Sequence, residues 1–376
     1  MVSIVLPTFN GSKYLSQSIE SIIGQTFNDW ELIIVDDCST DNTWEIACTY
    51  AKLDSRIRVL HNEKNMKLPK SLNIGFREAK GDLFTWTSDD NYYYENAVEL
   101  MKKELDTSPR CIMVRASMDL VDSKGELIGR GIDYSSDRML YNNCMGACFL
   151  YRRRVLDDLG GYDEDLFGVE DYEYWLRVIF KYGDPAVLDD VLYAYRVHDK
   201  SLTATKRDLI RERLNLIRAR EFYRIVSRLN GNDRYLSALY YDLMMTDALD
   251  SHMENIILDR VEDLALFKNE LLPDKDYIVY GAGEYGDMAF EMIQELEGGR
   301  IVHYSDGDIN KIGTLKNGVS IINKEEMFLL SQDCQIIIAL DSSIILDVLR
   351  EFYYRGVRKM VTLQDVIRMK LHYEQK

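Results

Sequence analysis

Short apolar runs alternate with amphipathic stretches over the first 120 residues, and this alternation limits the fold more than any other feature of the 376-residue chain. The apolar runs predict strands at residues 2–6, 31–35, 57–61 and 83–86. Between them, apolar side chains recur every three or four positions, which is the period of a helix that buries one face. Strand–helix alternation predicts a mostly parallel α/β sheet, and such sheets bind ligands at the carboxyl ends of their strands.

The pattern changes after about residue 200. Two long helical stretches follow, at 206–228 and 234–263, and the first of them is rich in arginine. A second strand–helix alternation then predicts strands at 277–280, 300–304, 335–340 and 359–363. We therefore expect a first α/β domain over residues 1–204, a helical connector over 205–272 and a second, smaller α/β domain over 273–376.

Composition excludes several classes of protein. The 46 Lys and Arg against 63 Asp and Glu give a net charge of −17, which disfavours binding to the phosphate backbone of nucleic acids. The six cysteines form no CxxC pair, as expected of reduced thiols in the cytosol. The chain opens on a strand rather than a signal peptide, and no apolar run approaches the roughly 18 residues of a transmembrane helix. We expect a cytoplasmic protein.

Adjacent acidic residues follow the predicted fourth strand, where Asp89 and Asp90 come directly after Ser88. Two carboxylates at a strand end offer the hard oxygen ligands that Mg²⁺ or Mn²⁺ prefers, with waters and phosphates as further ligands. An acidic pair at this position can also cap the next helix, because aspartate is favoured at the N-cap. Taken alone, the segment favours capping.

Two further acidic pairs stand at similar positions. Asp36 and Asp37 end the predicted second strand, where a carboxylate can accept a hydrogen bond from an N–H donor such as a uracil imide. Glu170 and Asp171 open a helix, whose N-terminus stabilises an ionised carboxylate, and such a carboxylate can act as a general base on a sugar hydroxyl. Each pair also has an ordinary interpretation, a helix cap for the first and an acidic first turn for the second.

Together, the three pairs and the opening VSIVLPTFNGSKYLSQSIESIIGQTFNDWELIIVDDCSTDNT resemble a family-2 glycosyltransferase with the GT-A fold, over about residues 1–200. The segment FTWTSDDNYYYENA is similar to the DxD region of the family's spore-coat glycosyltransferase. The resemblance implies an inverting transferase that uses Mn²⁺ or Mg²⁺. It would move a sugar from a nucleotide-sugar, for which we expect a UDP-sugar, to a hydroxyl of a glycan or lipid-linked acceptor in cell-surface polysaccharide synthesis.

The same resemblance assigns roles to single residues. The loop around the nucleoside matches Pro7, Thr8 and Asn10, and the residue that reads uracil matches Asp37. Positions that contact the ribose, the diphosphate and the metal match Lys67, Asp89 and Asp90, with Asp90 the metal ligand and Asp89 beside it. The catalytic base matches Asp171, with Glu170 as its neighbour. Many members carry a further aspartate where this chain has Thr87, so we expect weaker metal binding here than where three carboxylates converge.

The C-terminal segment carries a second motif. Gly281, Gly283 and Gly286 follow a predicted strand, and Asp306 lies 306 − 286 = 20 residues beyond the last glycine. This is the context of a dinucleotide-binding fingerprint and resembles the Rossmann-like half-domains attached to some sugar transferases. About a hundred residues supply only half of a dinucleotide site, and no Tyr-x-x-x-Lys dyad follows. The sequence therefore favours docking or self-association over a second nucleotide site, and NAD is disfavoured.

Two other interpretations of the whole chain stay open at this point. A NAD-dependent sugar-nucleotide oxidoreductase would explain the glycines but has no use for the acidic pairs, and a non-catalytic scaffold would be expected to have lost one pair. The arginine-rich stretch at 206–228 could contact anionic lipids at the inner face of the membrane, or it could be a solvated helix that packs its apolar side on the protein. The second interpretation of that stretch is slightly favoured.

Overall fold

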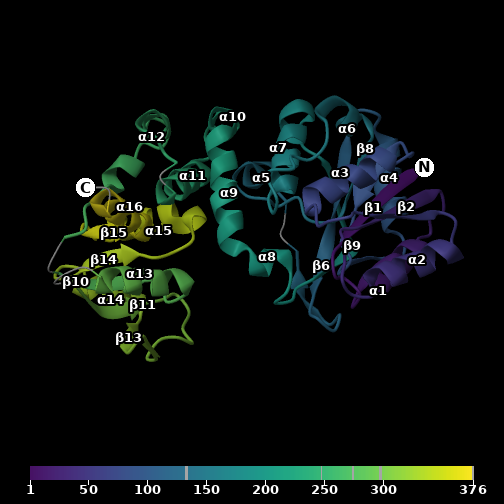
Figure 1. Ribbon diagram of the computed structural model, residues 1–376. Coiled ribbons are helices and arrows are strands. Elements are labelled where there is room, and N and C mark those ends of the chain that lie inside the picture. The colour runs from purple at the N-terminus through teal and green to yellow at the C-terminus, as the bar shows by residue number, and fades with distance from the viewer. Residues whose placement is uncertain (132–133, 247, 273–274, 296–298, 375–376) are drawn as a thin grey trace. The chain divides into compact units, whose positions relative to one another are not determined.

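The computed structural model describes residues 1–131, 134–246, 248–272, 275–295 and 299–374. The chain forms two compact units, Met1–Leu214 and Asn215–Lys376, and each has its own sheet (Figure 1). The helices after residue 214 belong to the second unit. The finer division, with a separate connector over 205–272, stays a prediction.

Within the described residues, the first unit is built on one nine-stranded mixed sheet of order β3-β2-β1-β4-β8-β6-β9-β5, with β7 paired to β6. Its parallel part consists of β1 (Val2–Thr8), β2 (Trp30–Asp36), β3 (Ile57–His61) and β4 (Leu83–Trp86). The other strands are β5 (Tyr92–Tyr93), β6 (Met113–Val121), β7 (Leu127–Arg130), β8 (Phe149–Arg152) and β9 (Ala186–Arg196). The four strands predicted from the apolar runs are confirmed.

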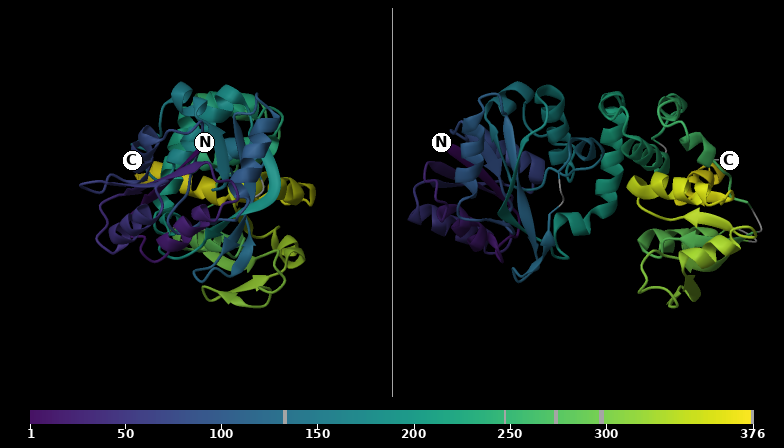
Figure 2. Two further views of the ribbon diagram at one scale, coloured as in Figure 1. Left: turned by 90° about the vertical axis from the view of Figure 1, so that its right-hand side faces the viewer. Right: turned by 180° about the vertical axis from the view of Figure 1, so that it is seen from behind.

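Helices cover both faces of this sheet (Figures 1 and 2). On one face, Ile4 and Leu6 of β1 share an apolar core with side chains of α1 and α4. On the other face, Val5 lies against α3. Covered on both faces, all seven residues of β1 are buried, as expected for a central parallel strand. The helices are α1 (Leu15–Ile23), α2 (Thr43–Leu53), α3 (Leu68–Glu78), α4 (Ala97–Thr107), α5 (Ser136–Tyr141), α6 (Arg154–Leu159), α7 (Glu170–Tyr182), α8 (Leu202–Thr205) and α9 (Arg207–Arg220), the last of which continues into the second unit.

Parallel pairing brings the carboxyl ends of β1, β2, β3 and β4 to one edge of the sheet. Thr8 at the end of β1 lies opposite Asp36 of β2, and Asp36 lies opposite His61 of β3. On the other side of β1, Val5 lies opposite Trp86, the last residue of β4. The acidic pairs that follow β2 and β4 therefore flank the end of β1, and this edge positions the candidate site.

The second unit has a six-stranded sheet of order β12-β13-β11-β10-β14-β15 in its described part. The strands are β10 (Asp276–Tyr280), β11 (Arg300–Ser305), β12 (Leu315–Lys316), β13 (Val319–Ile322), β14 (Gln335–Ile338) and β15 (Met360–Thr362). The helices are α10 (Phe222–Arg228), α11 (Asp233–Met245), α12 (Ser251–Leu258), α13 (Glu284–Gln294), α14 (Lys324–Leu330), α15 (Ser342–Tyr354) and α16 (Leu363–Glu374), with a 3₁₀ turn at Leu264–Phe267. The expected strands are present, and α11 packs on α15 and α16. The antiparallel β12–β13 pair was not predicted, because its strands are too short to show a period.

The arginine-rich stretch forms two helices rather than one. Helix α9 ends at Arg220 and α10 begins at Phe222, so Glu221 interrupts the expected continuous helix. Arg218 is buried and donates from Nη1 to Asp242 Oδ2 at 2.8 Å and to Asn215 Oδ1 at 2.7 Å. This arginine is part of the packing of the second unit rather than of a charged surface.

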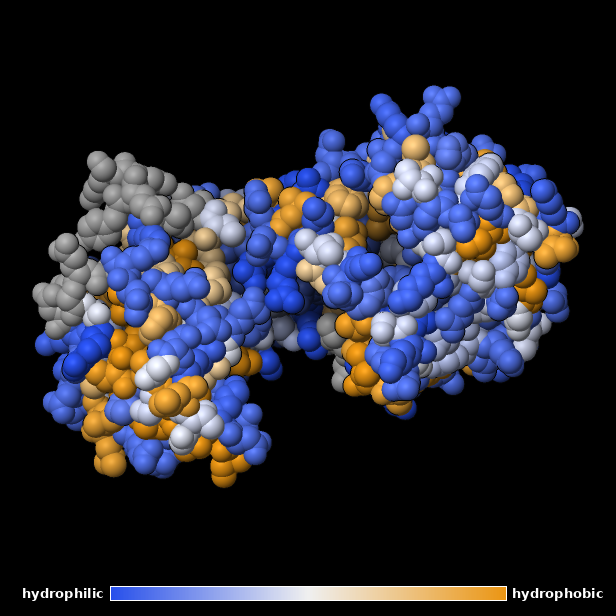
Figure 3. Space-filling model, turned by 60° about the horizontal axis from the view of Figure 1, so that its bottom comes forward, coloured by the Kyte–Doolittle hydropathy of each residue, from blue (hydrophilic) through white to orange (hydrophobic). Residues whose placement is uncertain are grey.

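Within the described ranges, no helix is both long and apolar enough to cross a bilayer. Hydrophobic residues reach the surface of the second unit on the face drawn in Figure 3. The large apolar side chains most exposed in that unit are Ile309, Leu315, Leu329 and Tyr354. Exposed apolar residues of this kind are ordinary when they are scattered, so they do not by themselves define an interface.

Gly75 allows α3 to approach the sheet. A Cβ added there would lie 2.4 Å from Val5 Cγ1 and 3.2 Å from Val35 Cγ2. Both neighbours are stiff β-branched side chains, so overpacking should outweigh the better helix propensity of alanine. We expect Gly75→Ala to lower the free energy of unfolding by about 1–3 kcal/mol in urea denaturation. In the control Gly129→Ala, the nearest atom is Leu120 Cδ1 at 3.9 Å, and we expect no loss. Equal stability of the two variants would contradict this packing.

Candidate active site

The loop after β1 closes on the acidic pair that follows β4. Thr8 donates a short hydrogen bond from Oγ1 to Asp89 Oδ2. A Cβ on Gly11 would lie 2.0 Å from Asp89 Oδ2 and 2.6 Å from Thr8 Oγ1, so this contact requires glycine at position 11. Pro7 is buried within β1, opposite Val35. Sequence reasoning singled out Thr8 and Asp89 but missed Gly11, whose role depends on a residue 78 positions away (89 − 11).

Asn10 ties this loop to the loop after β2. Its backbone is in the left-handed region, with φ of 56°, and its N–H donates to Ser39 Oγ at 2.9 Å. Its side-chain Oδ1 accepts from Thr40 N at 2.8 Å. Asp41, just beyond, is partly withdrawn from water, but hydrogen bonds from Thr43 and Ser12 hold its pKa below the usual value. The two loops that flank the end of β1 therefore form one bonded unit.

Asp37 organises the segment that leads into α3. Its carboxylate accepts hydrogen bonds from Asn62 Nδ2 at 2.8 Å, Met66 N at 2.7 Å and Lys67 N at 2.9 Å. An ionised carboxylate has about four acceptor positions, so these three donors leave one for a ligand. Lys67 has its backbone at Asp37, while its Nζ lies 5.8 Å from the centre of the Phe167 ring, close to the start of α7.

Asp90 faces a residue that the sequence analysis did not single out. His198 follows β9, and its Nε2 lies 3.1 Å from Asp90 Oδ2, while Ser88 Oγ donates to Asp90 Oδ1 at 2.6 Å. His198 is 108 residues from Asp90 and is brought there by the pairing of β9 with β5 and β6. The sequence offered only a weak signal, one of five histidines just beyond a strand.

These side chains suit a divalent cation. Partial withdrawal from water and the charge of Asp90 raise the pKa of Asp89 to about 7, even though Thr8 and the Phe9 N–H donate to it. A cation would relieve that repulsion, and a carboxylate with an imidazole is a common pair of metal ligands. The described residues contain no group of three or more His, Cys, Asp or Glu side chains able to hold a metal. Phosphates and waters would have to supply the remaining ligands.

Arg196 holds this region together from the end of β9. Its side chain is only 2% exposed and donates to Asp90 O at 2.9 Å, Asp122 O at 3.0 Å and Gln17 Oε1 at 2.7 Å. The guanidinium also lies 4.4 Å from the centre of the Tyr14 ring. One buried cation therefore joins α1, the loop after β4 and the hairpin after β6.

Glu170 and Asp171 lie side by side at the N-terminus of α7. Asp171 accepts from Tyr172 N and from Asn143 Nδ2, both at 2.7 Å, and is partly exposed. Glu170 is buried and accepts from Gly168 N at 2.5 Å. Burial and then the charge of Asp171 raise the pKa of Glu170 to about 8, and burial also raises the pKa of Asp171. The exposed member of the pair is the one that can reach a ligand.

Tyr195 responds to the charges of both acidic regions. It lies on β9, three residues before His198. Burial raises the pKa of its phenol, and the charges of Asp90 and Asp171 both add to that increase. The carboxylate beside His198 and the carboxylate at the start of α7 therefore both influence the same phenol.

The glycines of the second unit are explained mainly by packing. Gly281 has φ of 112°, and a Cβ there would lie 2.3 Å from Ala339 O; a Cβ on Gly286 would lie 2.3 Å from Gly281 O. Asp306 accepts from Ala282 N at 2.8 Å and pairs with Lys311 Nζ at 3.0 Å. Gly283 is the N-cap of α13, and no atom lies within 4 Å of an added Cβ there, so packing does not require it. The first turn of α13 carries Glu284 and Asp287, which disfavours a phosphate there.

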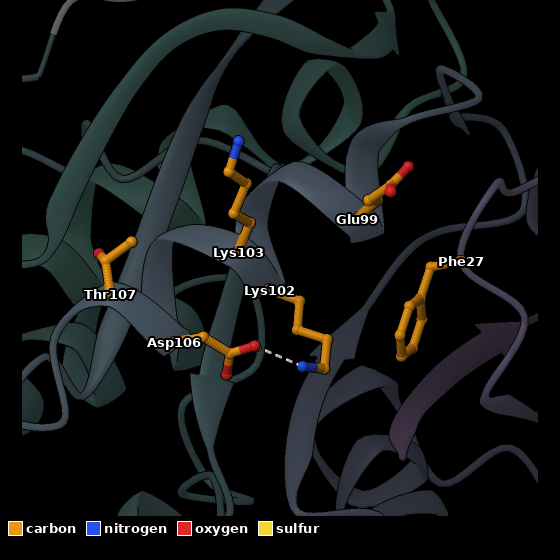
Figure 4. Close-up of a pocket in the computed structure, with 6 residues that line it drawn as sticks. All are labelled: Phe27, Glu99, Lys102, Lys103, Asp106 and Thr107. Atoms are coloured by element: carbon orange, nitrogen blue, oxygen red, sulfur yellow. Dashed lines mark hydrogen bonds and ion pairs between the residues drawn. The ribbon is translucent and has the colours of Figure 1, made fainter.

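The pocket in Figure 4 lies away from this edge. Its lining comes from α4 and the loop before β2, and Lys102 forms an ion pair with Asp106 at 2.5 Å. It contains none of the candidate residues. The lining residues are Phe27, Glu99, Lys102, Lys103, Asp106 and Thr107. A shallow hollow between exposed charged side chains gives no reason to place chemistry there.

Comparisons with known proteins agree with the fold of the first unit. The pattern of glycosyl transferase family 2 matches residues 3–160. An uncharacterized glycosyltransferase of Rickettsia typhi is 30% identical over 226 residues, which are 56% of this chain and 69% of that protein. One from Rickettsia prowazekii is 28% identical over 223 residues, with the same shares of 56% and 69%. Among solved structures, S. aureus TarS 1–349 in complex with UDP-GlcNAc has a TM-score of 0.52 at 20% identity, over 70% of this chain and 80% of that one.

Loss of the Arg196 guanidinium should destabilise the first unit. Arg196→Met keeps much of the side-chain volume but leaves the acceptors of Asp90, Asp122 and Gln17 without their donor. Because such acceptors are costly when buried, we expect the free energy of unfolding to fall by about 2–4 kcal/mol in urea denaturation. In the control Arg130→Met, the arginine is 76% exposed and 3.9 Å from Asp119, and we expect a change within about 0.5 kcal/mol. Similar losses in both variants would show that Arg196 does not have this role.

Proposed function

Because this chain belongs to glycosyltransferase family 2 and has the GT-A fold, we propose that its first unit transfers a sugar from a nucleotide-sugar to an acceptor hydroxyl with inversion of configuration. The observation that carries the proposal is the pair of carboxylate sites: Asp90, whose Oδ2 lies 3.1 Å from His198 Nε2, and the partly exposed Asp171 at the start of α7. Displacement at a sugar diphosphate needs a site that stabilises the leaving diphosphate and a separate carboxylate that acts as the base.

The donor would lie along the carboxyl edge of the parallel strands. Asp37 has one acceptor position left for the imide N–H of a pyrimidine, and the loop containing Thr8 and Asn10 is fixed beside it. Lys67 offers a cation for the diphosphate on the side that faces Phe167. TarS binds UDP-GlcNAc, which makes a UDP-sugar the first donor to test here.

Asp90 and His198 would hold a divalent cation, Mn²⁺ or Mg²⁺, with Asp89 next to them. Such a cation supplies charge neutralisation to the departing diphosphate. The support for this assignment is the 3.1 Å approach of Asp90 Oδ2 and His198 Nε2, together with the pKa of Asp89, which burial and the charge of Asp90 raise. Residues of the chain itself supply the rest: Arg196 fixes the backbone of Asp90, and Ser88 fixes its side chain.

The chemical step is a single displacement. Asp171 accepts the proton of the acceptor hydroxyl, and the oxygen forms a bond to the anomeric carbon. The bond from that carbon to the diphosphate oxygen breaks on the opposite side, and its electron pair leaves with the nucleoside diphosphate. An α-linked donor therefore gives a β-linked product. Glu170 is buried and keeps its proton more readily than an ordinary glutamate, so it adds less negative charge beside the base.

We further propose a glycan or lipid-linked saccharide of cell-surface polysaccharide synthesis as the acceptor. The exposed cations Lys200, Lys206 and Arg207 follow β9 near the site, and they would attract an anionic acceptor or membrane surface. For residues 273–376 we propose docking or self-association rather than a part in the reaction. Support comes from the acidic first turn of α13 and from the packing that explains Gly281 and Gly286.

Asp90→Ala should abolish metal-dependent turnover while the protein stays folded. We expect hydrolysis or transfer of UDP-GlcNAc with Mn²⁺ to fall at least about 100-fold, because removing one preorganised electrostatic stabiliser typically costs that much. The control is Asp199→Ala, which removes an exposed carboxylate next to His198 and should leave the rate unchanged. Full activity of the wild type in EDTA would rule out the metal assignment.

Asp171→Asn should separate donor binding from transfer. The amide keeps the shape of the side chain but cannot accept the proton, and loss of a positioned base typically costs about 10²–10⁴-fold in rate. UDP affinity, measured by calorimetry, should be unchanged. Because the ionised form is the active one and burial raises its pKa, wild-type activity should fall as pH drops below that raised value. If UDP affinity falls as far as the rate, Asp171 belongs to the donor site, and Glu170→Gln would then be the variant to examine.

A further inference from the structure

In the segment between α5 and β8, the side chain of Asn143 reaches the start of α7. Asn143 donates from Nδ2 to Asp171 Oδ2 at 2.7 Å. Sequence reasoning assigned no role to Asn143, and it lies 28 residues before Asp171. The bond links the carboxylate proposed as the base to a loop that carries no other proposed catalytic group.

Asn143 is itself held in place on both sides. Before it, Leu140 accepts a buried hydrogen bond from the Tyr172 hydroxyl at 2.9 Å, which fixes the end of α5 to the first turn of α7. After it, Met145 accepts from Arg115 Nε at 3.0 Å, which fixes the loop to β6. An amide anchored in this way can determine where its hydrogen-bond partner points.

The two bonds to Asp171 use both of its oxygens. Tyr172 N holds Oδ1 and Asn143 holds Oδ2, each at 2.7 Å. Rotation of the carboxylate would break both bonds, so its plane is fixed. Each oxygen keeps a second lone pair, and these lone pairs can receive a hydroxyl proton.

We propose that Asn143 is a positioning residue that orients the Asp171 carboxylate toward the acceptor hydroxyl and keeps it in its ionised, proton-accepting form. This inference rests on the proposed role of Asp171 as the base. Asn143 does not have to touch either substrate to act in this way.

The charges around Asp171 fit this role. Burial raises the pKa of Asp171, while the hydrogen bonds from Tyr172 N and Asn143 counteract the rise. Among the neighbours, burial and then the charge of Asp171 raise the pKa of Glu170 on α7, and Arg213 on α9 counteracts that rise. Two phenols also face Asp171, that of Tyr162 before α7 and that of Tyr195 on β9. Burial and the charge of Asp171 raise the pKa of both, so both phenols stay neutral. Two further charged groups face the surroundings of Asp171. The Lys67 ammonium lies over the Phe167 ring, and the charge of Asp90 raises the pKa of Tyr195.

The test compares pH profiles in the full-length protein. The rate of UDP-GlcNAc hydrolysis with Mn²⁺ is measured from about pH 4 to 9 for the wild type, Asn143→Ala and Asn143→Asp. Loss of a hydrogen bond to a charged group should move the acid midpoint upward by about one to two pH units in Asn143→Ala. Asn143→Asp keeps nearly the same side-chain shape but puts a second negative charge where the amide donor stood. The upward shift of the acid midpoint should therefore be larger than in Asn143→Ala. Asn142→Ala, a change of the adjacent residue, should leave the midpoint unchanged.

A second measurement does not depend on turnover. The Asp171 carboxyl carbon is titrated by NMR in protein labelled with ¹³C-aspartate, and its signal is identified by its absence in Asp171→Asn. A midpoint that rises in the order wild type, Asn143→Ala, Asn143→Asp supports the proposal. A lower rate at every pH with an unchanged midpoint in both measurements overturns it and leaves Asn143 a purely structural residue.

The outcomes also separate this inference from the proposed function. If Asp171→Asn keeps the wild-type hydrolysis rate, the base assignment fails, and the inference about catalysis fails with it even where the carboxyl midpoint moves. If Asp171→Asn is inactive while Asn143→Ala keeps the wild-type midpoint, the base assignment stands and only the role of Asn143 is overturned. Thermal unfolding of each variant shows whether a lost signal reflects lost folding.

Discussion

The pairing of β1 with β2 on one side and β4 on the other is the constraint on which the first unit depends. This central strand is buried along its whole length, so its backbone groups must pair with neighbouring strands, and its side chains must pack on both faces. Parallel register then places Thr8 beside Asp36 and the end of β4 beside Val5. The residues that follow these strands have to meet at one edge, whatever chemistry they carry.

Negative charge concentrated at that edge is compensated in different ways. Asp37 receives three N–H donors from the segment before α3, so its charge is satisfied inside the protein. Asp89 has fewer donors, and burial together with the charge of Asp90 raises its pKa. At α7, one member of the acidic pair is buried and the other keeps partial access to solvent. The two regions where carboxylates crowd together are the ones to which we assign the cation and the acceptor.

Much of this arrangement could be predicted from residues close together in sequence. The apolar runs predicted the parallel strands. The acidic pairs stand at strand ends or at a helix start, and the resemblance to a family-2 glycosyltransferase then identified Asp37, Asp89, Asp90 and Asp171 within them as candidates. The interruption at Glu221 was not predicted, since the helical period of residues 206–228 runs through it without a proline or glycine. His198, Arg196 and Asn143 were also missed, because each acquires its role from a partner found only in the folded chain.

The sequence by itself determined the strand–helix alternation and the positions of the acidic pairs, because periodic burial and residue order are local properties. Only the tertiary structure decided which side chains complete them. His198 approaches Asp90 from 108 residues away, and Asn143 approaches Asp171 from 28 residues away. Such contacts depend on strand order and on the hydrogen bond from Tyr172 of α7 to Leu140 of α5, which no local period encodes. The need for glycine at position 11 was also decided by the tertiary structure, because a side chain there would collide with Asp89.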